Sequence, residues 1–181
     1  MLLVYFIVAA IPLGYLLGGR LSNYLHRPLR MLPLPCLAFL AEASFGFIAA
    51  RIPAARWLGY AVCLEYALLA AFVWFNRARR GMKLMALATA CNFLVIAVNG
   101  FRMPVSPLIH DYPKYQSLVA RIQSGALPEY VLVDWNGPLW FLGDTIPLFG
   151  GLASVGDLLM GAALLILIVH LMRSKPEAED L

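Results

Sequence analysis

Polar residues that can bind ligands or exchange protons interrupt stretches of this sequence that are otherwise strongly apolar. The set is Glu42, Glu65, Asn92, Asn99, Arg102, Asp144 and Asp157. Charged and amide groups are costly in hydrocarbon, and those found there usually face a functional site or a water-filled cavity. We therefore predict that these residues form a substrate-binding site.

The charge balance of this set limits its chemistry. Four carboxyl groups stand beside one nearby cation, Arg102. Because burial and mutual repulsion both oppose ionisation, we expect at least one carboxyl to carry a proton or to bind a cation. The set is compatible with a proton-titrating site, with a cation or amine site, or with an anionic substrate held by Arg102.

Each of these residues also has a purely structural interpretation. A glutamate in a membrane helix can hydrogen-bond to a neighbouring helix, and Asn99, which is followed by glycine, can end a helix. Both aspartates precede apolar runs and can cap a helix N-terminus, although Ser154 competes with Asp157 for that role. Arg102 can extend its side chain to lipid phosphates.

The composition indicates which elements must hold these residues. The chain has 181 residues, of which 62% are hydrophobic and 13% are charged, and its mean hydropathy is +0.78. This is far more apolar than a globular protein. A helix that spans a bilayer needs about 20 mostly apolar residues, and five segments qualify. We predict spans at about 2–19, 31–50, 57–75, 84–100 and 151–172.

The predicted fold class is an all-α integral membrane protein with one transmembrane helical domain over residues 1–172. Residues 101–150 would form an extracytoplasmic loop and residues 173–181 a cytoplasmic tail. Apolar residues at helical spacing predict a short amphipathic surface helix within 111–125. The stretch 139–149 is too short to span a bilayer and contains glycine and proline, so we predict a re-entrant or interfacial segment.

The basic residues predict the orientation through the positive-inside rule. With the N-terminus outside, the cytoplasmic side would hold Arg20, Arg27, Arg30, Arg77, Arg79, Arg80, Lys83, Arg173 and Lys175. The outer side would hold only Arg51, Arg56, Arg102, Lys114 and Arg121. We therefore expect a multi-pass membrane protein with its N-terminus outside and its C-terminus in the cytoplasm.

This orientation would bring the polar residues to similar depths. At about 1.5 Å per residue, Glu42, Glu65 and Asn92 would lie roughly 10 to 12 Å below the outer boundary, with Asp157 slightly above them. The other three residues of the set would form the mouth of the same space. We infer a polar cavity that opens to the outer face.

The sequence predicts two kinds of partner besides the lipid bilayer. A small-molecule or cation ligand would occupy the cavity. Ala10, Gly14 and Gly18 recur at four-residue spacing, which would let a helix of another membrane protein approach closely. Although the net charge is +4, the basic residues form short clusters between apolar runs, so we expect no nucleic-acid partner.

Motifs for cofactors, metals or common catalysis are missing. Cys36, Cys63 and Cys91 all lie in apolar segments without paired spacing. His110-Asp111 has no second histidine close in sequence, which favours a solvated loop pair. Phosphate loops, nucleophile elbows and His-Glu-x-x-His motifs do not occur. We therefore expect no cofactor and no metal site, and we assign no catalytic residue.

Three short motifs carry a resemblance to a known family. They are Asn99-Gly100-Phe101-Arg102-Met103-Pro104-Val105-Ser106, Leu142-Gly143-Asp144-Thr145-Ile146-Pro147-Leu148 and Ser154-Val155-Gly156-Asp157. The chain resembles a family of small bacterial multi-pass membrane proteins defined only as a domain of unknown function. The resemblance implies a bacterial cytoplasmic membrane protein and implies no activity.

Three functional hypotheses follow. The first is a protein that binds or transports a small molecule or ion in the outward-facing cavity. The second is an accessory or structural subunit of a larger membrane complex, which would use the small residues of the first span. The third is an enzyme acting on a lipid or isoprenoid substrate, with Asp144 and Asp157 as acid, base or cation ligands.

Overall fold

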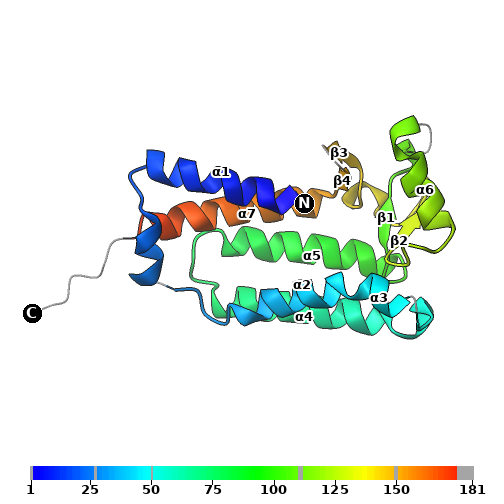
Figure 1. The fold of residues 1–181 in the computed structure, drawn as a ribbon, viewed down its shortest axis with the longest axis horizontal. Coiled ribbons are helices and arrows are strands. Elements are labelled where there is room, and N and C mark those ends of the chain that lie inside the picture. Colours follow the sequence, from blue (N-terminus) through cyan, green and yellow to red (C-terminus); the bar gives the residue numbers. More distant parts are fainter. Residues whose placement is uncertain (1, 27, 50, 110–111, 149–150, 175–181) are drawn as a thin grey trace, which may run out of the picture.

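Long helices lie side by side and carry a small cap of strands and short helices at one end (Figure 1). The computed structural model describes residues 2–26, 28–49, 51–109, 112–148 and 151–174. The predicted loop pair His110-Asp111 and most of the predicted tail lie outside the described residues.

The helices of the bundle follow the predicted spans, with one break. They are α1 (Leu2–Leu16), α2 (Pro33–Ala43), α3 (Phe45–Ala49), α4 (Leu58–Phe75), α5 (Met82–Val98) and α7 (Val155–Met172). The second predicted span is divided at Ser44, whose hydroxyl donates a 2.8 Å hydrogen bond to the carbonyl oxygen of Leu40. Such a bond to the preceding turn competes with the helix backbone and often bends it.

Two of these helices are long and apolar enough to cross a membrane. The helices α4 and α7 each have 18 residues, with mean hydropathies of 1.8 and 2.2. The helices α1 and α5 and the combined stretch 33–49 are apolar but shorter. The structure is mostly helical and supports a membrane association through two helices, which is fewer than the five spans predicted from sequence.

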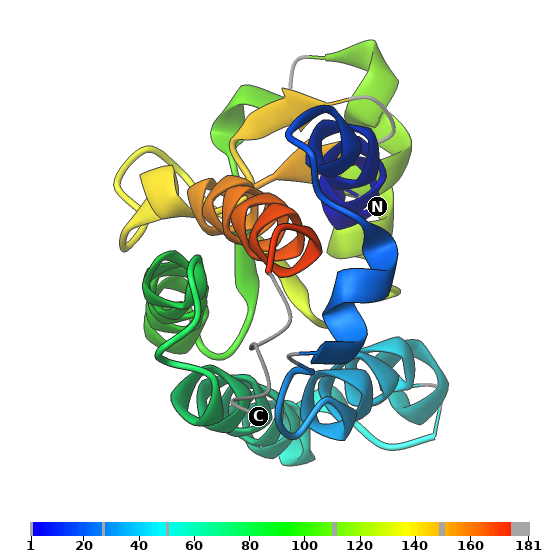
Figure 2. The ribbon, with the colours of Figure 1, turned by 90° about the vertical axis from the view of Figure 1, so that its left-hand side faces the viewer.

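The bundle helices form a curved row in the order α1, α7, α5, α4, α2, seen end-on in Figure 2. Apolar side chains of α4, α5 and α7 form one core, built around Phe72, Met82, Ala163 and Leu167. A second core, nearer the cap, contains Phe45, Val62 and Val95. These two cores hold α5 between α4 and α7.

The small residues predicted to bind another membrane protein lie against the chain's own α7. Ala10 is fully buried, and a Cβ atom at Gly14 would overlap with the side chain of Met172. Gly18 lies beyond the end of α1 in a turn with a positive φ of 76°. Contact with a partner through these residues stays a prediction, and within the chain they pack α1 onto α7.

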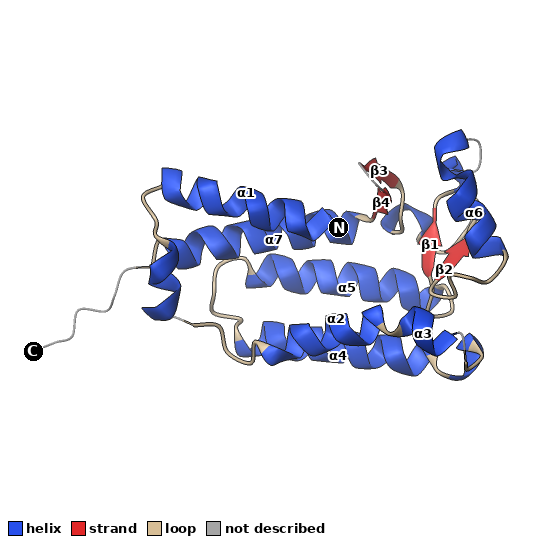
Figure 3. Ribbon diagram, in the orientation of Figure 1, coloured by secondary structure: helices blue, strands red, loops and turns tan. Residues whose placement is uncertain are grey.

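The cap contains short strands that the all-α prediction did not include (Figure 3). β1 (Met103–Val105) pairs in parallel with β2 (Tyr130–Leu132), and β3 (Ile146–Leu148) pairs antiparallel with β4 (Gly151–Ala153). Strands of three residues are too short to show an alternating pattern in the sequence. The described parts of two predicted segments, 111–125 and 139–149, therefore belong to this folded cap.

The first of these segments contains α6 (Gln116–Gln123), which lies within the predicted amphipathic stretch 111–125. Its buried residues Val119 and Ile122 join Val105, Ile109 and Tyr115 in the core of the cap. The second segment, 139–149, contains a 3-10 turn at Trp140–Leu142 and then β3. Both segments position side chains at the end of the helical bundle.

Candidate functional site

Asn92, Ser154 and Asp157 form a closed hydrogen-bond network between α5 and the start of α7. The Asn92 Nδ2 donates to Asp157 Oδ1 at 2.9 Å, and the Ser154 hydroxyl donates to Asn92 Oδ1 at 2.9 Å. The Asp157 backbone N–H donates to the Ser154 hydroxyl at 2.9 Å, while the Ser154 N–H donates to Asp157 Oδ2 at 3.1 Å. Every side-chain oxygen of Asn92 and Asp157 therefore has a partner within the chain.

This network is a capping box with an added asparagine. Ser154 and Asp157 satisfy each other's backbone N–H groups, as capping boxes do at helix N-termini. Asn92 fixes the capped end of α7 against α5. A Cβ atom at Gly156 would overlap with the Asn92 side chain, so the glycine permits the close approach. Ser154, the competing candidate, is therefore the N-cap of α7, and Asp157 supports it from the third helical position.

Asn99 also makes structural contacts. It ends α5, and its Nδ2 donates 2.8 Å hydrogen bonds to the carbonyl oxygens of Val95 and Pro138. Gly100 and Phe101 follow with positive φ values of 69° and 61°. Asn99 thereby closes its helix and ties it to the cap, as the helix-end interpretation of the sequence predicts.

The carboxyl groups of the predicted set approach one another across the bundle. Glu42 lies on α2, close enough to interact electrostatically with both Glu65 on α4 and Asp157 on α7. Asp157 also lies within electrostatic range of Asp144 in the cap. Four elements thus bring these acids near a common region, although Glu42 itself is exposed.

Arg102 is not brought to these acids. It is exposed and lines a separate cavity of about 330 Å³ together with Arg56, Gly59 and Phe101. No ion pair between Arg102 and an acidic residue occurs in the described part of the chain. The structure therefore gives no support for an anion held between Arg102 and the carboxyl groups.

Asp144 lines a large cavity. Its backbone N–H donates to the Pro104 carbonyl at 2.9 Å, and its carbonyl accepts from the Ser106 N–H at 3.1 Å. A Cβ atom at Gly143 would overlap with Pro104, so the glycine lets this segment lie against β1. The result is a buried carboxyl group on a fixed backbone.

The cavity beside Asp144 has a volume of about 740 Å³ and lies between the cap and the start of α1. Ligand sites in proteins typically occupy about 300 to 1,000 Å³. The polar residues that line the cavity are Tyr5, Lys114, Tyr115, Ser117, Glu129, Tyr130 and Asp144, and the others are apolar apart from Gly151. Lys114 and Ser117 are exposed, so the cavity opens to solvent beside α6.

Two polar atoms at this cavity are buried without a partner. Within the described residues, the Tyr115 hydroxyl and the Glu129 Oε2 are buried and make no hydrogen bond. A buried polar atom left unsatisfied costs about 1 to 3 kcal/mol. Tyr115 itself is 7% exposed, so bulk water does not reach it freely. Both atoms therefore have unused hydrogen-bonding capacity in residues that line the cavity.

The carboxyl group of Asp144 is tuned by its surroundings. Burial, assisted by the nearby charge of Asp157, raises the pKa of Asp144 to about 7. Burial, together with the charge of Asp144, also raises the pKa of Tyr130 above its usual range, so its phenol stays protonated. Near neutral pH the cavity therefore holds a carboxyl group that exchanges its proton readily and a phenol that does not.

A single basic residue lies at the edge of the cavity. The Lys114 ammonium lies 5.2 Å from the centre of the Tyr115 ring and 3.5 Å from the carbonyl oxygen of Leu148. It makes no ion pair with Asp144 or Glu129, and its contacts show that the Tyr115 face attracts cations. The interior of the cavity is thus acidic and aromatic.

Sequence reasoning missed Lys114, Tyr115, Glu129 and Tyr130 as site residues. It looked for polar groups at a common depth within the predicted spans, whereas these residues lie in the segment assigned to a loop. The available signal was Glu129, an acid placed between Pro128 and the apolar run that becomes β2. Only the folding of the cap brings it beside Asp144.

Comparisons with known proteins give a family but no activity. Searches of curated proteins and of solved structures found no match. A family model described as "Family of unknown function (DUF5317)" matches residues 26–169. The match covers most of the chain and confirms the resemblance to an uncharacterised family. This chain therefore belongs to the DUF5317 family of unknown function.

Proposed function

We propose that this protein is a bacterial membrane protein that binds a small organic cation in the cavity between its cap and its helical bundle. The observation that carries the proposal is the pair of buried, unpartnered polar atoms, the Tyr115 hydroxyl and the Glu129 Oε2, beside the carboxyl group of Asp144. The positive charge of an ammonium group, with or without N–H groups, is attracted to carboxylate and phenol oxygens and to the faces of tyrosine rings. The ligand would complete the polar contacts of the cavity.

The membrane placement in this proposal keeps the five predicted spans, with the N-terminus outside and the C-terminus in the cytoplasm. Support comes from the end of the bundle opposite the cap (Figure 1). Its connections carry Arg20, Arg30, Arg77, Arg79, Arg80, Lys83 and Arg173. The Arg20 N–H bonds the Met172 carbonyl at 2.8 Å, and the Arg30 N–H bonds Asn76 Oδ1 at 2.9 Å. A basic end is expected on the cytoplasmic side.

The cavity would then face outward at the membrane boundary. The start of α1 contributes Leu2 and Tyr5 to its wall, and the cap contributes the remainder. Many helix residues expose large apolar side chains, among them Val8, Leu64 and Leu94, and burial of such side chains in lipid is favourable. This position would expose the cavity to solutes on the outer side while the bundle anchors the protein.

An organic cation fits the cavity better than a metal ion. Among the described residues, no group of three or more histidine, cysteine or acidic side chains could hold a metal. Aromatic rings instead surround the acids, and tyrosine faces attract ammonium groups when desolvated. Lys114 at the edge could contact an anionic end of the same ligand. The proposal therefore favours an amine or a zwitterion with a compact head group.

The test is a titration of purified protein with tetramethylammonium chloride, followed by isothermal calorimetry. We expect saturable binding that Asp144→Asn and Glu129→Gln each weaken about tenfold, since a charged contact contributes roughly 1.5 to 3 kcal/mol. Asp134→Asn is the matched control because Asp134 is an exposed acid of the cap that does not line the cavity. That variant should bind like the wild type.

Titrations with sodium chloride at the same ionic strength and with sodium acetate serve as controls. Binding of acetate in preference to tetramethylammonium would contradict the proposed ligand class. Equal binding by wild type and both cavity variants would place the cation elsewhere on the protein.

A further inference from the structure

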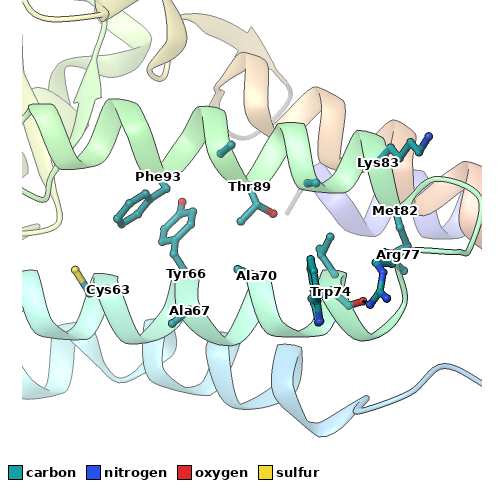
Figure 4. A pocket seen from close by; sticks show the side chains of 13 residues that line it. Cys63, Tyr66, Ala67, Ala70, Trp74, Arg77, Met82, Lys83, Thr89 and Phe93 are labelled. Carbon is teal, nitrogen blue, oxygen red and sulfur yellow. Dashed lines mark hydrogen bonds between the residues drawn. The ribbon is translucent and has the colours of Figure 1, made fainter.

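A second cavity lies between α4 and α5 (Figure 4). Its volume is about 600 Å³. The wall consists of residues from Cys63 to Trp74 on α4, of Arg77 just beyond the end of α4, and of residues from Met82 to Phe93 on α5. It is therefore an elongated groove that follows the two helices.

Small side chains keep this groove open. Ala67 and Ala70 line it from α4, and Ala86 and Ala90 line it from α5. Small residues facing each other usually let two helices approach closely, but here they leave space along the seam. At the end nearer the cap, Tyr66 and Phe93 narrow the groove, with ring centroids 5.3 Å apart.

The middle of the groove offers a ligand almost no polar partner. The Thr89 hydroxyl donates a 2.8 Å hydrogen bond to the Met85 carbonyl of its own helix, and the other hydroxyl of the lining belongs to Tyr66 towards the cap. The neighbouring wall residues are alanines and Val73. An occupant of this stretch must be apolar, since a polar one would lose its hydrogen bonds to water without replacement.

The opposite end of the groove is basic. Arg77 and Lys83 both line it there and both are exposed (Figure 4). The Arg77 guanidinium lies 4.4 Å from the centre of the Trp74 ring. Tryptophan and basic residues together are typical of the head-group level of a membrane. Arginine and lysine side chains are also common phosphate ligands.

The length of the groove matches an acyl chain whose phosphate-bearing head group lies at the basic end. Between Tyr66 and Phe75, α4 rises by about 14 Å at about 1.5 Å per residue. One leaflet of a bilayer contributes about 15 Å of hydrocarbon, half of its apolar thickness. A chain that starts at Arg77 and Lys83 would therefore run through one leaflet before it reaches Tyr66 and Phe93.

We propose that the groove between α4 and α5 binds one anionic glycerophospholipid, with an acyl chain along the alanines and the phosphate between Arg77 and Lys83. This inference goes beyond cation binding in the cap and shares with it only the membrane placement. Arg77 and Lys83 at one end favour an anionic head group, and the apolar wall over the remainder favours an acyl chain.

The experiment uses native mass spectrometry of delipidated protein titrated with phosphatidylglycerol or phosphatidylcholine of identical acyl chains. Wild type should bind one phosphatidylglycerol about tenfold more tightly than phosphatidylcholine, because basic residues near the membrane surface favour anionic lipid. The double variant Arg77→Gln/Lys83→Gln should lose this preference while still binding either lipid weakly. Arg80→Gln is the matched control, since Arg80 is exposed and basic but does not line the groove.

A second variant tests the apolar part. Ala86→Phe places a large side chain into the groove at an exposed position, so we expect it to weaken both lipids about equally. Ala120→Phe, at an exposed alanine of α6, controls for the added aromatic ring. Recovery of every variant in the membrane fraction tests the membrane placement separately. Tetramethylammonium binding by the groove variants shows whether the cation site of the cap is intact.

Four results would overturn the inference. The first is equal binding of both lipids by the wild type, and the second is unchanged binding in Ala86→Phe. The third is a dimer of the chain that dissociates in Ala86→Phe, which would assign the groove to a helix of a second copy. Binding of glycerol 3-phosphate as tightly as phosphatidylglycerol would also contradict a role for the acyl chain.

Discussion

The side-chain amide of Asn92 lies against the α-carbon of Gly156, at the place where any larger residue would carry its Cβ atom. This contact sets the distance between α5 and α7 at the point where α7 begins. The same glycine precedes Asp157, whose carboxylate accepts from the Asn92 amide at 2.9 Å. Gly156 and Asp157 therefore join the start of α7 to α5.

The first prediction concerns this contact. Gly156→Ala should lower the free energy of unfolding by about 1 to 3 kcal/mol, since the added methyl group must displace Asn92 or separate the helices. Thermal unfolding in one detergent measures the effect. Gly151→Ala is the control because no atom lies within 4 Å of its Cβ position. Equal stability of the two variants would show that α5 and α7 adjust without cost.

The second prediction separates capping from ligand binding at Asp157. Asp157→Asn should cost about 1 to 2 kcal/mol of stability, because a neutral amide cannot accept from both Asn92 and the Ser154 N–H as a carboxylate does. Tetramethylammonium binding to the folded variant should stay unchanged, since Asp157 does not line the cavity. Loss of binding with unchanged stability would show that Asp157 takes part in ligand binding and not in capping.

Much of the bundle could be predicted because its helices are long and apolar. Hydropathy located α4, α5 and α7 within a few residues. The sequence left the cap of α7 open between Ser154 and Asp157, and the structure assigns it to Ser154. The break at Ser44 could not be predicted in the same way. It depends on a side-chain hydrogen bond to Leu40 that many membrane helices accommodate without ending.

The site was harder to predict than the bundle for a physical reason. Polar residues in apolar segments are the natural candidates for a site. Asn92, Asn99 and Asp157, however, make hydrogen bonds to one another or to the backbone. The unsatisfied atoms belong to Tyr115 and Glu129, which are unremarkable in the sequence. Whether a polar group lacks a partner depends on the tertiary contacts of the cap, and local sequence does not contain them.

The third prediction follows from the raised pKa of Asp144. The folded protein holds this proton up to about pH 7, whereas the unfolded chain loses it near the ordinary value of 3.8. The folded state therefore binds more protons between these values, and its stability falls as the pH rises from about 4 to 7 and is constant above that range. For this group alone, the loss between about pH 5 and pH 8 would be up to roughly 3 kcal/mol.

Thermal unfolding at both pH values tests this dependence. Asp144→Asn should reduce it by the contribution of this one group, because an amide has no proton to lose in this range. Asp134→Asn, at an exposed position, should retain the wild-type dependence. A pH profile of Asp144→Asn that matches the wild type would show that another group is responsible.

The fourth prediction sets stability against binding at Tyr115. The hydroxyl of Tyr115 is buried without a hydrogen-bond partner, so Tyr115→Phe should stabilise the ligand-free protein by about 1 kcal/mol. The same change should weaken tetramethylammonium binding, since the ligand loses one of the groups that surround it. Tyr112→Phe serves as the control because Tyr112 is exposed and does not line the cavity. Residues that destabilise the empty protein and favour the liganded one are expected at binding sites. If Tyr115→Phe instead destabilises the ligand-free protein, the hydroxyl has a partner of its own and the cavity loses its main mark of a ligand site.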